Sequence, residues 1–87
     1  MNKKVKTQLI DDLKASDHIT ISCGALHLIM NKSNVEEFEG NLELTIHGAR
    51  QEISLEHVTE TTRETITDKF ISWTLEGECY KIVISIY

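Results

Sequence analysis

The hydrophobic pattern is most pronounced near Tyr87, where two apolar runs flank a turn sequence. Phe70–Leu75 and Cys79–Tyr87 meet at Glu76-Gly77, which predicts a β-hairpin with a two-residue loop. In this register large apolar side chains oppose one another on one face, Trp73 with Tyr80 and Ile71 with Ile82. The segment Ile82–Ile86 carries apolar residues at both parities, as a strand covered on both faces does. We therefore expect it to be an interior strand.

The chain opens with a helical pattern. Between Lys3 and Ala15, apolar residues recur at intervals of three to four and charged or amide side chains lie between them: Val5, Leu9, Ile10 and Leu13. This predicts an amphipathic helix that covers one face of a sheet. A basic helix lying on a membrane surface is the alternative, but Asp11 and Asp12 dilute its positive charge.

From residue 19 the apolar period changes to two and its parity then reverses across Gly24-Ala25. A two-residue hairpin requires such a reversal, and Gly at the first loop position fits a type II′ turn. The expected cross-strand pairs are Cys23 with Leu26, Ile21 with Leu28, and Ile19 with Met30. A bulge at Gly24 within one long strand is the alternative.

The middle of the chain predicts a short helical turn and a second hairpin. Ser33 and Glu36 have the spacing of a capping box, which could start one turn through Phe38 with Val35 and Phe38 facing inward. After it, alternating apolar residues flank Gly48-Ala49, so a Gly-led hairpin would pair Leu44 with Ile53 and Leu42 with Leu55.

Residues 57–68 give conflicting signals. Leu55, Val58, Thr62, Ile66 and Phe70 fit a helical stripe, whereas the many threonines favour extended structure. We favour an extended polar edge or a wide connection, with a helix as the alternative. The whole pattern predicts a single α+β domain over residues 1–87, with the N-terminal helix packed on a mostly antiparallel sheet of about six strands built from three hairpins.

Composition limits the function classes. The chain has 87 residues, 40% of them hydrophobic and 26% charged, and a formal net charge of −5, which disfavours direct binding to nucleic acid. The acids gather in the middle, since residues 33–68 carry nine of them against two arginines. No segment has membrane-spanning length and the N-terminus lacks the apolar run of a signal peptide, so we expect a cytoplasmic protein.

Candidate catalytic and metal-ligating residues are few. No pair of the four histidines has the close spacing of a zinc motif; we expect His27 and His47 on the polar sides of their hairpins and His57 at an inward parity, with His18 the remaining one. Cys23 alternates with core residues and should be a buried thiol, while Cys79 should be more exposed. We expect no enzyme activity, no cofactor, no metal and no disulfide framework.

The remaining feature is acidic. The predicted middle hairpin projects Glu43, Glu52 and Glu56 from its polar face, and further glutamates flank it in sequence: Glu36, Glu37 and Glu39. Such a surface either keeps a small β protein soluble or steers it onto a basic partner, such as the nucleic-acid-binding surface of another protein. If the helix covers the opposite face, Trp73 and Tyr80 would form an exposed aromatic patch.

Three segments resemble the small acidic phage-encoded anti-CRISPR inhibitors. They are residues 7–14 (Thr-Gln-Leu-Ile-Asp-Asp-Leu-Lys), 17–22 (Asp-His-Ile-Thr-Ile-Ser) and 66–72 (Ile-Thr-Asp-Lys-Phe-Ile-Ser), the last expected to be helical in that family. The family carries denser acidic clusters near the C-terminus, whereas this chain ends on an apolar strand. The resemblance implies an inhibitor that binds a protein, and it assigns no role to individual residues.

These observations favour a non-enzymatic protein-binding module, carried by a phage or another mobile element and acting in the cytoplasm of a bacterial host, which occupies a basic surface of a host protein. Two alternatives stay open. One is a structural or assembly subunit that self-associates, for example as a homodimer, through a sheet edge or an apolar face. The other is a small immunity or antitoxin protein, which differs from the first hypothesis only in its partner.

Overall fold

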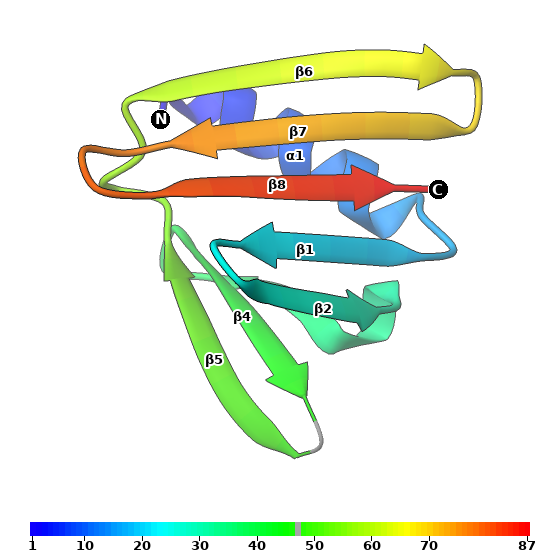
Figure 1. The fold of residues 1–87 in the computed structure, drawn as a ribbon, viewed down its shortest axis with the longest axis horizontal. Helices are drawn as coiled ribbons and strands as arrows, with labels where there is room; N and C mark the ends of the chain where they lie inside the picture. Colours follow the sequence, from blue (N-terminus) through cyan, green and yellow to red (C-terminus); the bar gives the residue numbers. More distant parts are fainter. Residues whose placement is uncertain (47) are drawn as a thin grey trace.

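The computed structural model describes residues 1–46 and 48–87, and within them one α-helix and eight strands form a helix-covered pair of antiparallel sheets (Figure 1). The five-stranded sheet has the order β2-β1-β8-β7-β6 and the three-stranded sheet the order β3-β4-β5. This confirms the predicted α+β class, with eight strands in place of about six. The elements are α1 (Lys3–Lys14), β1 (Ile19–Cys23), β2 (Leu26–Met30), the 3-10 helix η1 (Lys32–Asn34), β3 (Val35–Phe38), β4 (Asn41–Ile46), β5 (Ala49–Ser54), β6 (Glu60–Thr67), β7 (Phe70–Glu76) and β8 (Lys81–Ile86).

Helix α1 forms where the sequence predicts it. The side chain of Asn2 accepts a hydrogen bond from the Val5 N–H at 2.9 Å and so caps the first turn. On the covered side Leu9 and Leu13 are buried, and Asp12 is buried beside them. In Figure 1 the helix lies behind β7 and β8, so it covers one face of the five-stranded sheet.

The β1–β2 hairpin has the predicted register, with Cys23 opposite Leu26, Ile21 opposite Leu28 and Ile19 opposite Met30. Gly24 has a φ of 60°, the left-handed value that a Gly-led turn needs at its first position. The hairpin prediction is therefore confirmed and the bulge alternative is wrong.

Strand β8 is the central strand of its sheet, as its double-faced apolar pattern predicts, but the β7–β8 register differs from the prediction. Trp73 lies opposite Ile84 and Ile71 opposite Ile86, because the loop spans residues 77–80 instead of Glu76-Gly77. The slip is an even number of residues, so every side chain keeps its face. The pairing of β8 with β1, which places Ile84 opposite Ile21, selects the observed register.

The predicted helical turn through Phe38 is wrong. Asn31, not Ser33, provides the cap, and the 3-10 helix it starts ends at Asn34. The following residues form β3, in which Val35 is half-buried and Phe38 is 56% exposed instead of facing inward. The early cap leaves the chain free to pair with β4 from Val35 onward.

The middle hairpin also has a corrected register. Leu42 lies opposite Ile53 and Leu44 opposite Gln51, two residues from the predicted pairing, because β4 ends at Ile46 and β5 already begins at Ala49. His47, which we expected on the polar side of this hairpin, lies outside the described residues. Gly48 has a φ of 81°, which accounts for glycine at this turn.

Residues 60–67 form the edge strand β6, so the favoured prediction of an extended edge is confirmed and the helical alternative is wrong. The helix that the resemblance implies over residues 66–72 is absent, since these residues form the end of β6, a turn and the start of β7. Among the described residues no helix is long and apolar enough to cross a membrane.

One hydrophobic cluster joins the helix to both sheets. Its fully buried members come from α1, both sheets and the segment after β5: Leu9, Ile19, Leu42, Leu44, Leu55, Leu75 and Ile84. The three-stranded sheet thus directs its leucine-bearing face to the core and leaves its other face to solvent.

Candidate protein-binding surface

The outward face of the three-stranded sheet carries a row of three glutamates, which we call the acidic row: Glu36, Glu43 and Glu52. Glu36 on β3 lies directly opposite Glu43 on β4, and Glu43 lies directly opposite Glu52 on β5. Neighbouring strands are roughly 4.8 Å apart, so the three carboxylates project side by side from a rigid support. The row combines two of the three glutamates predicted for this face with one that was predicted only to flank it.

Among the described residues the acidic row makes one ion pair. Arg50 approaches Glu43 at 4.0 Å, but its side chain is 76% exposed, so this ion pair is weak. Glu52 accepts a hydrogen bond of 2.7 Å from the Asn41 side chain, which orients the carboxylate without neutralising it. Because the three carboxylates carry more negative charge than the one guanidinium can balance, this face is negative.

The side chain of Glu43 is only 17% exposed and lies between two other carboxylates. Like charges directly opposite one another destabilise a sheet. We therefore expect Glu43→Gln, which keeps the shape and removes the central charge, to raise the free energy of unfolding by about 0.5 kcal/mol. Urea unfolding at low salt measures the change, and high salt should reduce it. A loss of stability in Glu43→Gln would contradict this expectation, because it would show that the charge of Glu43 is stabilising in the folded chain.

An aromatic side chain lies on the same face. Phe38 lies opposite Asn41, two residues along β3 from Glu36, and is 56% exposed. Sequence reasoning missed it because the capping-box signal placed it inside. The signal that could have identified it is Asn31, an N-cap residue two positions before Ser33, which shifts the helical turn toward the N-terminus.

The other predicted acidic residues lie elsewhere. Glu37 has the opposite parity to Glu36 and accepts a hydrogen bond of 3.0 Å from the Gly40 N–H. Glu39 occupies the β3–β4 turn with a φ of 50°. Glu56 follows the end of β5 and lines a hollow with Glu78 and Tyr80. The structure therefore does not bring these three into the acidic row.

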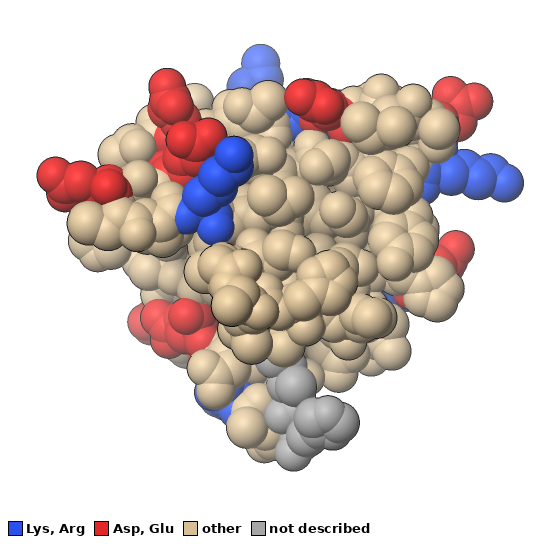
Figure 2. Space-filling model, viewed as in Figure 1, with Lys and Arg blue, Asp and Glu red and all other residues tan. Residues whose placement is uncertain are grey.

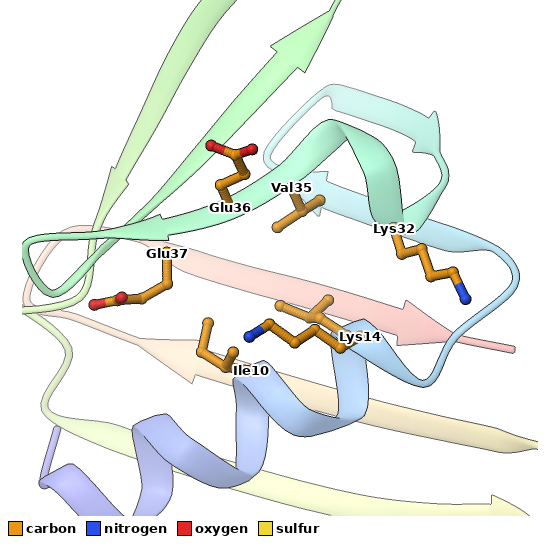
Figure 3. Close-up of a pocket in the computed structure, with 7 residues that line it drawn as sticks. Ile10, Lys14, Lys32, Val35, Glu36 and Glu37 are labelled. Carbon is orange, nitrogen blue, oxygen red and sulfur yellow. The ribbon is translucent and has the colours of Figure 1, made fainter.

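A groove of about 260 Å³ lies between the end of α1 and β3, and Figure 3 shows the residues that line it. Ile10 and Val35 point into it, Lys14 lies along it, and Glu36 points to the opposite side of β3. The side chains of the acidic row therefore project from the face of β3 opposite to this groove. The groove is lined by aliphatic side chains, two lysines and Glu37, and Glu36 borders it although its carboxylate points away, so no single ligand chemistry is indicated.

The predicted aromatic patch does not form. Trp73 is 2% exposed beneath α1, where its indole N–H donates to Asp12 Oδ2 at 2.7 Å. Tyr80 lies in the β7–β8 loop, half-buried, and its buried hydroxyl has no hydrogen-bond partner among the described residues. Helix α1 covers the face on which Trp73 projects, which is the reason for the difference.

The predicted thiol and imidazole placements are partly corrected. Cys23 is exposed, not buried, because it lies at the hairpin end of β1, where the two sheets leave a groove between them. Cys79 is exposed as expected. His57 is exposed in the turn after β5 instead of facing inward, and His27 is exposed with its Nδ1 2.8 Å from Ser22 Oγ. Within residues 1–46 and 48–87, no group of three or more His, Cys, Asp and Glu side chains could hold a metal ion.

Comparison of the chain with protein-family models, with curated proteins and with solved structures finds no match. The candidate surface therefore rests on the geometry of the acidic row and Phe38.

Proposed function

We propose that this chain is a non-enzymatic protein-binding module that uses the acidic row and Phe38 to occupy a basic surface of another protein. The observation that carries the proposal is the direct cross-strand alignment of Glu36, Glu43 and Glu52. Solubility needs dispersed charge only, and dispersed charge would avoid the repulsion that this alignment creates.

The geometry suits a target that binds a polyanion. The strands that carry the three carboxylates are roughly 4.8 Å apart, so the carboxylates form a negative line on a rigid support, which steers a basic partner and fixes its orientation. Phe38 supplies an exposed aromatic group beside that line, and aromatic residues are enriched at the core of protein interfaces. The nucleic-acid-binding site of a host protein fits this chemistry.

The resemblance to phage-encoded inhibitors supports the same proposal, with the chain carried by a phage or mobile element and acting inside a bacterial host. An immunity or antitoxin role would use the same contacts. The two roles differ in whether the captured basic protein is a defence enzyme of the host or a toxin, so identification of the partner decides between them.

The test compares two triple variants that each remove three negative charges from a net charge of −5. The first is Glu36→Gln with Glu43→Gln and Glu52→Gln. The matched control neutralises exposed acids of β6 and its turn: Glu60→Gln with Glu64→Gln and Asp68→Asn. Immobilised wild-type chain captures the partner from an extract of the native host, mass spectrometry identifies it, and titration of the purified partner gives the affinity.

We expect a basic partner whose affinity falls roughly 10- to 100-fold with the acidic-row variant and changes little with the control. Phe38→Ala should weaken binding without changing its salt dependence, because it removes an apolar contact. Equal affinities of both triple variants, or capture of a partner without a basic surface, would overturn the proposal.

A further inference from the structure

The edge strands of the two sheets differ sharply in charge. Among the described residues β6, β3 and β5 each carry at least two charged side chains, and β6 also has a register irregularity between Thr65 and Thr67. Charges and bulges are the usual protection of a sheet edge against pairing with another chain. Strand β2, with the sequence Leu-His-Leu-Ile-Met, carries neither.

Strand β2 is also unusually exposed for its composition. Ile29 is 76% exposed and Leu26 is 56% exposed, although both belong to an apolar five-residue strand. Figure 1 shows β2 at the lower margin of the five-stranded sheet, and Figure 2 shows that the surface in this region consists of uncharged residues. Its outer edge pairs with no other strand of the described chain.

The hairpin geometry identifies the free backbone groups. Residues Gly24-Ala25 form a two-residue turn that closes on Cys23 and Leu26. The closing pair of such a turn is hydrogen-bonded, and bonding alternates along an antiparallel ladder. Leu26, Leu28 and Met30 therefore direct their N–H and C=O groups to β1. His27 and Ile29 direct theirs outward from the sheet.

We propose that β2 pairs with β2 of a second copy of this chain, antiparallel about a two-fold axis at Leu28. In this register His27 of each copy lies opposite Ile29 of the other, so the outward backbone groups meet and form four N–H···O=C bonds. Leu28 faces its own counterpart and Leu26 faces Met30. Each pair is uncharged, and each side chain keeps its face of the sheet.

The distribution of charged residues favours β2 of a second copy, and not one of the other edge strands, as the pairing partner of β2. If β6 paired antiparallel with β6 of a second copy about a two-fold axis at Arg63 or Glu64, that residue would lie opposite its own counterpart. Like charges would then meet at the centre of the pair. Pairing of β2 with β3 or β5 would bury glutamates against leucine and isoleucine. The inference does not rest on the proposed function, because it is argued from the backbone groups and side chains of β2 alone.

The dimer should be weak. One pair of five-residue strands buries less than the roughly 800 Å² per partner of a standard interface. Sedimentation of the full chain between about 10 µM and 1 mM should therefore show a mass that rises from 9.9 kDa toward twice that value. Ile29→Pro removes an outward N–H that the monomer does not use, and should keep the mass at that of one chain throughout.

Two further variants separate edge pairing from misfolding. Ile29→Lys changes an exposed side chain without touching the backbone and should also abolish the mass increase. Ile66→Lys, an equally apolar exposed residue on the opposite edge strand, should leave it unchanged. Circular dichroism should show the same folded spectrum for all three variants.

Amide hydrogen exchange supplies the site-specific readout. The amides of His27 and Ile29 should exchange several-fold more slowly at 1 mM than at 20 µM, while those of Leu26 and Leu28 should be protected at both concentrations. A chain that stays at 9.9 kDa at 1 mM would refute the proposal. So would a dimer that persists in both Ile29 variants or leaves the two outward amides unprotected.

Discussion

Replacing Asp12 with alanine is expected to lower the free energy of unfolding by about 3 kcal/mol, a large part of the stability of a domain this small. The Asp12 carboxylate is 8% exposed and ties α1 to two strands. Oδ2 accepts from the indole N–H of Trp73 on β7 at 2.7 Å and from Arg63 Nε on β6 at 2.8 Å. Gln8, one turn earlier in the helix, donates to Oδ1 at 3.0 Å.

The loss is large because the partners stay buried when the carboxylate is removed. Trp73 is 2% exposed, so its indole N–H would become an unpaired donor in the core. Asp12→Asn should cost less, because the amide oxygen still accepts from Trp73. Asp11→Ala is the matched control, since it removes an exposed carboxylate from the preceding residue of the same helix and should change stability by no more than about 0.5 kcal/mol.

The same carboxylate should make stability depend on pH. Burial by itself would raise the pKa of Asp12, but hydrogen bonds from Arg63, Trp73 and Gln8 and the charge of Arg63 outweigh it and lower the pKa below 3.8. Because the pKa of Asp12 is lowered in the folded state, the stabilisation from its carboxylate is fully present above the pKa of the unfolded state. It is lost as the pH falls through the pKa of the folded state.

Urea unfolding at a series of pH values from 7 to 2 measures both effects. Wild type and Asp11→Ala should lose stability together in the acid range, whereas Asp12→Asn should lose less over that range. If Asp12→Asn and wild type showed parallel curves, the pKa of Asp12 would be the same in the folded and unfolded states, and the explanation of the effect of about 3 kcal/mol would fail.

The second large effect is expected at Gly77, where alanine should lower the free energy of unfolding by about 2 kcal/mol. A β-carbon there would lie 2.5 Å from Cζ of Tyr80 and 3.0 Å from the carbonyl oxygen of His57. The glycine is needed for space, because the Tyr80 ring packs directly over its Cα. The ring is half-buried and its hydroxyl is buried, so it has little room to move.

A double-mutant cycle with Tyr80→Ala tests this explanation. Removal of the ring should relieve most of the clash, so that Gly77→Ala costs about 0.5 kcal/mol or less in the Tyr80→Ala background. Gly24→Ala provides a contrast, since a β-carbon there meets nothing within 4 Å and its cost comes from the φ of 60°. Additive effects of Gly77→Ala and Tyr80→Ala would show that the glycine is required for backbone conformation instead.

Parts of the fold follow from local pattern. The 3.6-residue period of Leu9 and Leu13 predicts α1, and the parity reversal at Gly24-Ala25 predicts the β1–β2 hairpin with its register. The double-faced apolar run predicts β8 as an interior strand. These elements were predictable because each depends on residues close in sequence and on which side of an element is buried.

The sequence by itself thus determined the helix, most of the strands and the face that each predicted hairpin directs to the core. Only the tertiary structure decided the registers of the β4–β5 and β7–β8 hairpins, the division into two sheets and the outward position of Phe38. The physical reason is that side chains alternate with a period of two, so a slip of two or four residues leaves every buried face unchanged. Loop length and the neighbouring strand then select one register, and that selection places Glu36, Glu43 and Glu52 side by side.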